Sequence, residues 1–399
     1  MATNFPNNPS NGDTHAGFTY NSTKGVWEST ASAGTEPPVI LTEPPTTTQA
    51  LNTDGTTSTV TMTAQDPEGF DITYGIAYKT AGNALPDQLA SATTIDQSTG
   101  VYTFTPTTNA NNGGSFTARL SATDGIGYTT RLVNFSLAFS ASVEYLVVAG
   151  GGGGGVGNAG GGGGAGGLIA NSATLTPGTY NVTVGTGGAT STNGTGSSFN
   201  GDSTIGGGAG ADFAVYNQPS SAGNGGSGGG GLGYYGGNTN GGTGTTNQGY
   251  AGGDGVAFGS GVYKSGGGGG AGGVGQSATA GSAGDGGVGY QWVDGNFYAA
   301  GGGGGAIDES NGNVGSGDGG SSIGGNGTVA GNGGTSNRSA TDGAANTGSG
   351  GGGGGGAGAD GVVIIRTTSA AQATTGNPTL TTSGSYNIYT FTADGSITF

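Results

Sequence analysis

The sequence predicts a mostly β protein with irregular structure and almost no helix. Short runs of alternating apolar and polar residues, separated by turn-forming residues, recur through the first 141 positions. Of the 101 glycines among the 399 residues, 85 lie within 149–361, in blocks of two to seven. Two continuous apolar segments, 144–150 and 360–367, open and close this glycine-rich region. The alternating runs predict small sheets, and the glycine blocks with their apolar borders predict a separate glycine-rich domain.

Composition excludes several classes of protein. The net charge is −16 and the seven Lys and Arg residues are scattered, so no cationic cluster is present to bind nucleic acid. The absence of cysteine excludes a disulfide framework and thiolate metal sites. No apolar run reaches the roughly 18 residues of a membrane-spanning helix, so we expect no membrane insertion. The start, MATNFPNNPSNGD, lacks the features of a signal peptide. We therefore expect any export to use another route, such as assembly into a particle released by lysis.

Shifts in composition divide the chain into five expected segments. These are an N-terminal hairpin and attachment module (1–33), a proline-rich linker (34–45), a β-sandwich (46–142), a glycine-rich domain (143–367) and a C-terminal β-hairpin (368–399).

The N-terminal module is expected to be a small hairpin. Phe18-Thr19-Tyr20 alternates, 21–25 is a polar break, and Val26-Trp27 resumes the apolar pattern. Because a module this short buries little apolar surface by itself, we expect it to dock on a partner surface. The linker GTEPPVILTEPP contains four prolines around one short extended segment.

The third segment has the strand spacing of a β-sandwich. Residues 58–78, 100–106 and 115–139 predict at least five short strands, with turns at Asp66-Pro67-Glu68-Gly69 and Asp124-Gly125. Only LPDQLAS (85–91) looks locally helical.

The motifs AQDPEG-D-ITY, GVYTFTP and SATDGIG in this segment resemble bacterial cadherin-like and immunoglobulin-like repeats. In true cadherins the corresponding turn carboxylates bind calcium, and hard cations need several oxygen ligands. The resemblance therefore implies Asp66, Glu68, Asp71 and Asp124 as candidate ligands. Lone repeats usually lack the interdomain half of that site. We expect ordinary turn residues and no cofactor, with calcium as the alternative.

An isolated glycine rod is unstable, whereas in an array of rods the favourable and unfavourable free energies nearly cancel. Fixing a residue costs roughly 1–2 kcal/mol, and a net hydrogen bond returns about 0.5–1.5 kcal/mol. A polyproline-II rod has about three residues per turn and no internal hydrogen bonds. Rods without Cβ atoms can approach closely, so interior backbone groups find partners on neighbouring rods. We expect an ordered array, with a flexible tether as the alternative.

Burial of the apolar segments is expected to stabilise the ordered array. EYLVVAG (144–150) and DGVVIIRT (360–367) are continuous and β-branched, which a Gly/Ser linker does not require. Inside the region, TPGTYNVTVG (176–185) is strand-like, and GYQWVDGNFYAAG (289–301) predicts a hairpin with a tight Asp294-Gly295 turn. The rods are expected at 149–167, 206–210, 223–231, 265–275, 300–305 and 348–358.

The motifs YLVVAGGGGGG, GAGGLI, PGTYNVTVG, FYAAGGGGGA and GADGVVIIR together resemble the glycine-rich domain of bacteriophage tail fibres and adhesins. The opening FPNNPSNGDTHAGFTYNSTKGVWE resembles a hairpin module in fibre proteins of marine myoviruses, including cyanophages. This likeness covers 1–30 and about 143–399. It implies a polyglycine-II sandwich whose end loops contact the host. One departure is GSYNIYTFTADGSITF (384–399), which resembles the strand pair that normally precedes YLVVAGG. It implies a cap strand, a subunit contact or a truncated second module.

The resemblance also implies location and partners. We expect a virion protein, in a tail fibre or other surface appendage, that binds a host cell-surface glycan or outer-membrane protein and contacts other fibre or tail proteins. Fibres are commonly trimers, so we expect a homotrimer, although related tip adhesins can be single chains.

Aromatic residues in the breaks between rods are the candidate receptor contacts: Tyr216, Tyr234, Tyr235, Tyr250, Phe258 and Tyr263. Aromatic rings give a large contact area at low entropy cost, and loops on a rigid scaffold are common binding sites. The alternative is that these rings seal the rod faces. Trp292, Phe297 and Tyr298 are expected in the core.

Catalysis has little support in the sequence. The single histidine, His15, lies in the small hairpin and is expected to be structural or exposed, without a nucleophile to activate. Asp308 and Glu309 are adjacent carboxylates, but neighbours diverge in an extended chain and form no glycosidase pair. We therefore expect no enzyme, and interpret the chain as a virion fibre adhesin. The alternatives are a purely structural appendage, such as a neck whisker or capsid fibre, and an ice-binding or matrix protein. The last would need regular threonine spacing on one face, which the chain lacks.

Overall fold

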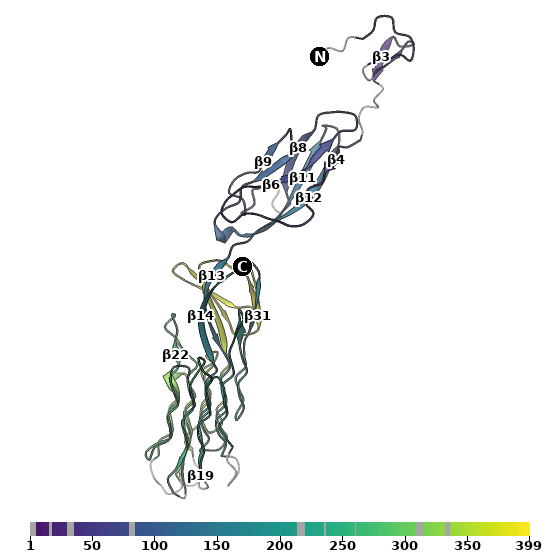
Figure 1. Ribbon diagram of the computed structural model, residues 1–399. Coiled ribbons are helices and arrows are strands. Elements are labelled where there is room, and N and C mark those ends of the chain that lie inside the picture. Colours follow the sequence, from purple (N-terminus) through teal and green to yellow (C-terminus); the bar gives the residue numbers. More distant parts are fainter. Residues whose placement is uncertain are drawn as a thin grey trace. The chain divides into compact units, whose positions relative to one another are not determined.

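The computed structural model describes residues 5–15, 18–29, 36–79, 84–213, 220–234, 237–259, 261–308, 314–331 and 336–399. The chain forms two compact units, residues 1–139 and 140–399 (Figure 1). Strands dominate, and the only helices in the described ranges are two single 3₁₀ turns, η1 (Ala110–Asn112) and η2 (Gly320–Ser322). The prediction of a mostly β fold with almost no helix is confirmed. No helix in the described ranges is long and apolar enough to cross a lipid bilayer.

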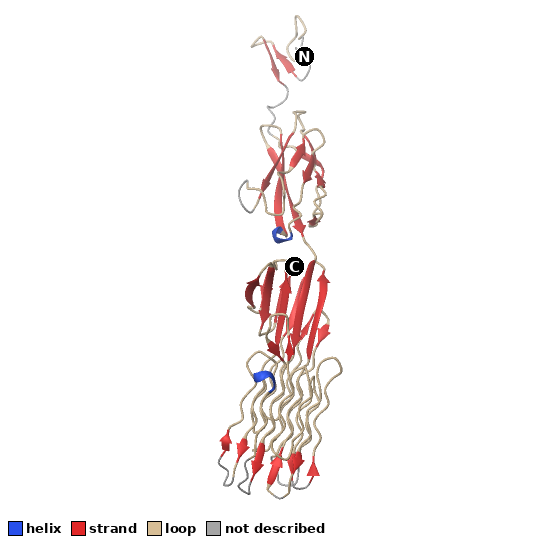
Figure 2. Ribbon diagram, turned by 90° about the vertical axis from the view of Figure 1, so that its left-hand side faces the viewer, coloured by secondary structure: helices blue, strands red, loops and turns tan. Residues whose placement is uncertain are grey.

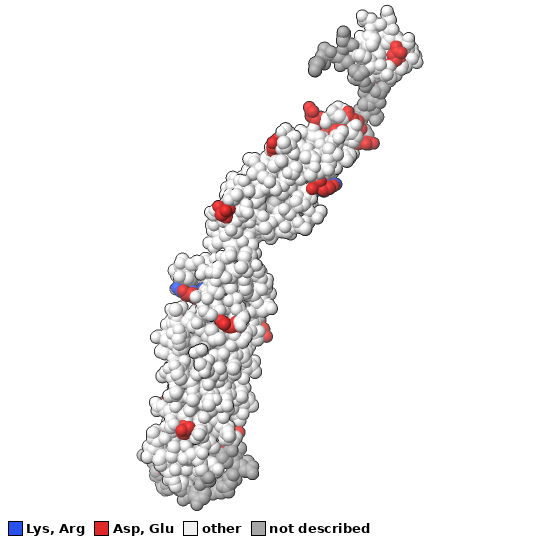
Figure 3. Space-filling model, viewed as in Figure 1, with Lys and Arg blue, Asp and Glu red and all other residues white. Residues whose placement is uncertain are grey.

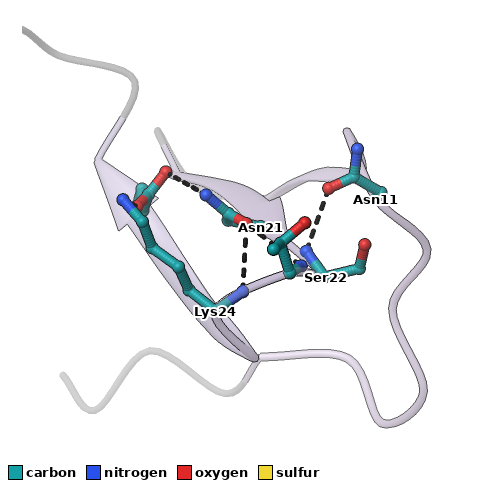
Figure 4. A network of polar contacts seen from close by, with 6 residues as sticks. Asn11, Asn21, Ser22 and Lys24 are labelled. Atoms are coloured by element: carbon teal, nitrogen blue, oxygen red, sulfur yellow. Dashed lines mark hydrogen bonds and ion pairs between the residues drawn. The ribbon is translucent and has the colours of Figure 1, made fainter.

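The first unit begins with the expected hairpin, extended to three antiparallel strands: β1 (Thr14–His15), β2 (Phe18–Asn21) and β3 (Val26–Ser29). Asn21 holds its turn, because its Oδ1 accepts from the Thr23 and Lys24 amides at 3.1 and 3.2 Å (Figure 4). Its Nδ2 donates to Glu28 Oε2 at 2.9 Å. Such an Asx turn compensates for the little apolar surface that so short a module buries.

A β-sandwich follows in the same unit. One sheet has the order β5-β12-β11-β8 and the other β6-β10-β9, while β4 pairs with β7. The bounds are β4 Val39–Thr42, β5 Gln49–Ala50, β6 Ser58–Thr61, β7 Thr63–Gln65, β8 Thr73–Tyr78, β9 Thr94–Asp96, β10 Val101–Phe104, β11 Gly114–Thr123 and β12 Tyr128–Leu137. The two sheets share one core, in which Phe104 of β10 lies 4.3 Å, centroid to centroid, from Phe135 of β12. The predicted strands and the Asp124-Gly125 turn are therefore present.

One segment of this unit differs from expectation. Residues 85–91 form no helix, because Leu89 is buried and bridges Pro106, and the Ala90 amide donates to Thr105 O at 2.9 Å. A segment this short is a marginal helix without tertiary support.

The short extended segment expected in the linker is β4, which pairs with β7. Beside it, both oxygens of Glu43 accept from the Arg131 guanidinium at 2.6 and 2.7 Å.

Among its described residues, the second unit contains three five-stranded sheets, two of which face each other across a shared core. Their orders are β14-β13-β27-β30-β29 and β17-β16-β15-β31-β28. The bounds are β13 Ala141–Val148, β14 Leu168–Leu175, β15 Thr179–Thr183, β16 Ser198–Phe199, β17 Asp202–Ser203, β27 Val362–Thr367, β28 Ala373–Thr375, β29 Thr379–Ser383, β30 Tyr386–Phe391 and β31 Gly395–Thr398. The strands of 368–399, expected as a separate hairpin, pair with β27 and β15 and thus complete both sheets.

The two apolar borders of the glycine-rich region are neighbours in one sheet. β13 and β27 pair antiparallel from Val143↔Thr367 to Val148↔Val362. Successive side chains of a strand point to opposite faces. Val143, Tyr145 and Val147 enter the core between the sheets, whereas Leu146 and Val148 pack with Trp292 and Tyr298 on the other face. Burial on both faces explains why these strands are continuously apolar.

Between the borders, the glycine blocks form rods with a three-residue repeat. Along 161–167, the amides of Gly161, Gly164 and Gly167 donate to the rod at 205–211. Those of Gly162 and Ala165 donate to 266–269, and those of Gly163 and Gly166 to 348–351. Each third residue thus turns to the same neighbour, which is the periodicity of polyglycine II and confirms the expected array.

The carbonyl groups of this rod bond to three further rods. They accept from amides in 149–155 and 227–230 and from the Gly302 amide, at N–O distances from 2.7 to 2.9 Å apart from 3.0 Å at Ser227. Rod 161–167 therefore has six hydrogen-bonded neighbours, and all of its amides and all but one of its carbonyl groups bond to them without strands or helices. Figure 2 shows these rods as loops that run from the two sheets to short strands at the opposite end.

The array requires glycine because neighbouring rods occupy the space of a Cβ. A Cβ on Gly161, Gly162 or Gly163 would lie 2.0–2.1 Å from a carbonyl oxygen of another rod. Backbone carbonyls of hydrogen-bonded rods cannot move aside independently. Alanine appears where a Cβ meets a side chain, as at Ala165, which packs in the cluster with Trp292.

The remaining short strands lie at the rod ends. β22 (Tyr290–Gln291) and β23 (Phe297–Tyr298) form the predicted hairpin, with Gly295 at φ +84° in its turn. At the opposite end lie β18 (Gly233–Tyr234), β19 (Gly237–Asn238), and a sheet of β20 (Val256–Ala257), β21 (Val262–Lys264), β24 (Ala306–Asp308), β25 (Val329–Ala330) and β26 (Ser336–Arg338).

We predict that Gly163→Ala destabilises the second unit by about 3 kcal/mol, because the new methyl overlaps Gly152 O and forces the rods apart. Gly281→Ala is the control, since nothing lies within 4 Å of its Cβ position. Chemical denaturation of the full chain measures both variants. Equal stability of the two would contradict tight rod packing.

A second prediction concerns Ser227, whose buried Oγ has no hydrogen-bond partner in the described chain. Ser227→Ala is expected to stabilise the fold by about 1 kcal/mol, because an unpaired buried hydroxyl is unfavourable. The matched variant Ser197→Ala should lose about 1–3 kcal/mol, since Ser197 Oγ donates to Val148 O at 2.7 Å and accepts from the Gly185 amide at 2.8 Å. Destabilisation by Ser227→Ala would show that its hydroxyl has a partner.

Candidate functional site

The residues considered for catalysis occupy structural positions. His15 of β1 is half-buried, with its ring centroid 5.8 Å from Phe5 and 6.2 Å from Trp27. Asp308 ends β24 and is 4% exposed, while Glu309 lies outside the described residues. His15 thus belongs to an aromatic cluster, and Asp308 is enclosed by the short strands at the rod ends.

Two of the turn carboxylates of the sandwich, Asp66 and Asp124, each use one oxygen to hold the backbone. Asp66 Oδ1 accepts from the Glu68 and Phe70 amides at 2.8 and 2.9 Å. Asp124 Oδ1 accepts from the Ile126 and Gly127 amides, both at 2.6 Å. These contacts are typical of Asx turns. The second oxygens, Asp66 Oδ2, Asp124 Oδ2 and Glu68 Oε2, are buried without a hydrogen-bond partner.

Crowding of these carboxylates affects Glu68. Burial, reinforced by the Asp66 and Glu36 carboxylates, raises the pKa of Glu68 above its usual value. Asp71 lines a shallow pocket beside Asp66. Within the described ranges, no group of three or more His, Cys, Asp or Glu residues is arranged to hold a metal ion. The hydrogen bonds of Asp66 and Asp124 to backbone amides give these two carboxylates a turn role, and calcium remains the alternative for experiment.

We predict that Glu68→Gln raises the thermal unfolding midpoint at pH 7. A carboxyl whose folded-state pKa is raised contributes stability below its unfolded pKa of about 4.3, and loses it as the pH rises through the folded-state value. The difference between variant and wild type should therefore vanish below about pH 4. Calorimetry of the full chain across this pH range measures it.

The control for that prediction has the opposite sign. Ser98 and Thr99 lower the pKa of Asp96, so Asp96→Asn should reduce the midpoint at pH 7, with the difference disappearing in acid. Calcium at roughly 1 mM tests the alternative role. A rise in the midpoint that Glu68→Gln removes would identify a cation site and contradict the turn interpretation.

Two predicted receptor residues lie on what we call the rod-end surface, formed by Tyr234, Phe258 and the strands β18–β21. Tyr234 ends β18 opposite Gly237 of β19 and is half-buried. Phe258 is 40% exposed, and Lys264 Nζ lies 4.8 Å from its ring centroid. Tyr216 and Tyr235 lie outside the described residues.

No sequence pattern indicated Lys264 as part of this surface. Its ammonium group packs against one face of the Phe258 ring. Lys264 is 2% exposed, and its Nζ donates to Ala280 O. Burial lowers the pKa of Lys264, and the nearby Asp308 carboxylate opposes this shift. The hydrogen bond to Ala280 O fixes the buried ammonium group. The cation–π contact with this ammonium group then helps to hold the Phe258 ring in place. This role depends on Ala280 and Asp308, which are distant from Lys264 in the sequence, so no local pattern predicts it.

The other predicted aromatic residues divide between interior and surface. Tyr263 is 5% exposed, and its ring centroid lies 5.4 Å from that of Phe213, so it seals the rods. Trp292 and Tyr298 are buried as expected, but Phe297 is 39% exposed because alternate residues of β23 face solvent. Tyr250 is 48% exposed.

Tyr250 lines a groove at the end of the rods nearest the sheets. The groove has a volume of about 940 Å³ and lies between β14, the turn at 246–250, Ala271-Gly272 and Tyr290. Tyr290, on β22, is 39% exposed. No sequence pattern indicated Tyr290 as a binding residue, because 40 residues separate it from Tyr250 and only the packing of the rods brings the two together.

Charge contributes little to the groove. None of the described residues that line it is Lys, Arg, Asp or Glu. On the face of the second unit seen in Figure 3, charged residues are few and separated. Contacts to a ligand would therefore come from aromatic rings, hydroxyls and amides.

Comparison with protein families matches residues 129–368 to the model of a glycine-rich domain. No curated protein and no solved structure matches the chain.

Proposed function

The chain belongs to the glycine-rich domain family, and we propose that it is a bacteriophage fibre or appendage protein that binds a host receptor. The observation that carries this proposal is the rod array, because a lattice of backbone hydrogen bonds supports exposed aromatic residues at fixed positions. A rigid support lowers the entropy lost when a surface binds its partner.

Receptor contact is assigned to the rod-end surface. Phe258 is exposed there, and Tyr234 is half-buried on β18, which contacts β20 immediately before Phe258. Tyrosine and phenylalanine are favoured in binding surfaces because they add contact area with few rotatable bonds. The receptor class is a host cell-surface glycan or an outer-membrane protein, contacted without a large charge contribution.

The first unit is assigned to attachment and spacing. Its three-stranded N-terminal module would contact other fibre or tail proteins, and its sandwich, which resembles cadherin-like and immunoglobulin-like repeats, would act as the spacer. We propose a virion location and a homotrimeric assembly, with no enzymatic activity and no cofactor. Immunogold labelling of phage particles tests the location, and light scattering tests the assembly. Label confined to a neck or capsid appendage would favour a purely structural role.

We predict that Tyr234→Ala combined with Phe258→Ala reduces binding of the labelled full chain to host cells at least tenfold, without loss of the folded state. The loss follows from removing two aromatic contacts, each of which often contributes more than 1 kcal/mol. Including Tyr235→Ala extends the test to the adjacent tyrosine. Flow cytometry on a panel of marine bacteria measures binding.

The matched control is Tyr128→Ala, because Tyr128 is 73% exposed and belongs to the first unit. Its binding should equal that of the wild-type chain. Unchanged binding of the Tyr234/Phe258 variant would place the receptor contact elsewhere, and absence of wild-type binding to any host would argue against an adhesin.

A further inference from the structure

We propose that the groove between Tyr250 and Tyr290 is a binding site for a neutral saccharide. It goes beyond the receptor contact assigned above, because the groove is lined by β14 and the turn at 246–250. Figure 1 shows β14 at the end of the rods opposite to β19. Its volume of about 940 Å³ is near the upper end of the roughly 300–1,000 Å³ of small-ligand sites.

The two tyrosines supply the apolar part of the site. Both line the groove and keep 48% and 39% of their surface exposed, although neighbouring rings such as Trp292 and Tyr298 are buried. The face of an aromatic ring is electron-rich. Sugar rings present faces of C–H groups that pack on such rings, while the tyrosine hydroxyls remain free to bond to sugar hydroxyls.

Unused polar groups lie beside these rings. Thr246 and Asn247 line the groove and are exposed, and their side chains make no hydrogen bond within the described chain. A hydroxyl and a carboxamide each offer donors and acceptors, as the alternating hydroxyls of a sugar require. The described residues of the lining include no charged side chain, and the chain carries a net charge of −16. A neutral ligand suits this lining better than an anionic one.

The groove is held in shape before any ligand binds. Gln248 Nε2 donates to Ser203 O at 3.1 Å, and its Oε1 accepts from the Ile205 amide at 2.8 Å. The Tyr250 amide donates to Gly270 O at 3.1 Å, and Tyr250 O accepts from the Gly228 amide at 2.9 Å. Because both sides of the turn are bonded to rods, binding requires little ordering of the backbone.

The edge of β14 is poorly suited to the other common occupant, an extended peptide. Strand addition needs a row of free backbone groups. The Leu168 amide already donates to Gln248 O at 3.0 Å, and the Ser172 amide donates to Asn171 Oδ1 at 2.8 Å. These bonds occupy the edge on both sides of Ala170, which favours a saccharide over a strand.

The test uses the purified full chain on an array of neutral oligosaccharides built from hexoses and N-acetylhexosamines, with sialylated and sulfated oligosaccharides as the anionic set. We expect binding to at least one neutral oligosaccharide. Calorimetric titration of that oligosaccharide should show at least tenfold weaker binding for Tyr250→Ala and for Tyr290→Ala. The two residues lie in different segments, so a folding defect in one variant leaves the other informative.

Phe297→Ala is the matched control, because Phe297 is also 39% exposed and belongs to the same hairpin, but does not line the groove. Its affinity should stay within twofold of wild type. The proposal is overturned if the chain binds no neutral oligosaccharide, binds only the anionic set, or binds equally well after both tyrosine substitutions. Capture of extended peptides that depends on Tyr250 and Tyr290 would also overturn it. These assays use no cells, and dependence of the affinity on Tyr250 and Tyr290 distinguishes the groove from a glycan bound through Tyr234 and Phe258.

Discussion

Hydrogen bonding between glycine rods is the interaction on which the second unit depends. A rod makes no bonds within itself, so its amides and carbonyls must find partners on other rods. Along 161–167 those partners repeat every third residue and come from six surrounding rods. The close approach holds only without side chains, since a Cβ at Gly163 would lie 2.1 Å from Gly152 O. Glycine here is a packing surface, although it has the highest conformational entropy to lose.

The apolar sheets make this array possible. β13 leads into the first rod and β27 follows the last, and the two strands pair directly. Joining both ends of the glycine-rich region in one sheet reduces the loop-closure entropy of the intervening chain. Leu146 and Ile364 add a second core beneath the rods, together with Trp292 and Tyr298. Hydrophobic burial at one end of the array thus stabilises a region that has little apolar surface of its own.

The same construction separates the rigid rod array from the exposed aromatic residues that we propose bind a partner. Rods tolerate almost no side chains, whereas the turns between them accept aromatic, amide and hydroxyl groups without disturbing the lattice. Phe258 over Lys264 at one end, and Tyr250 beside Tyr290 at the other, are exposed on backbone that is bonded on several sides. Binding loops are often found on such rigid scaffolds. Under the proposed function, substitution in the turns would therefore change the ligand while the array remains the same.

Local pattern by itself determined much of this fold. Alternation predicted the hairpin at Phe18–Trp27 and the strands of the sandwich, and glycine blocks with β-branched borders predicted the rod array. These features depend on neighbouring residues in the chain, so the sequence contains them directly. The helical interpretation of 85–91 was wrong because Leu89 has a better partner in Pro106 than in its own turn.

Tertiary structure alone decided which rods meet and which rings remain exposed. One glycine block is chemically the same as another, so the pairing of 161–167 with its six neighbours follows from turn lengths and from anchoring in the sheets. That pairing buries Tyr263 against Phe213, leaves Tyr250 exposed, and brings Tyr290 to it across 40 residues. The side chains of the candidate sites were therefore visible in the sequence. Their grouping was not, because rods without side chains contain no information about their neighbours.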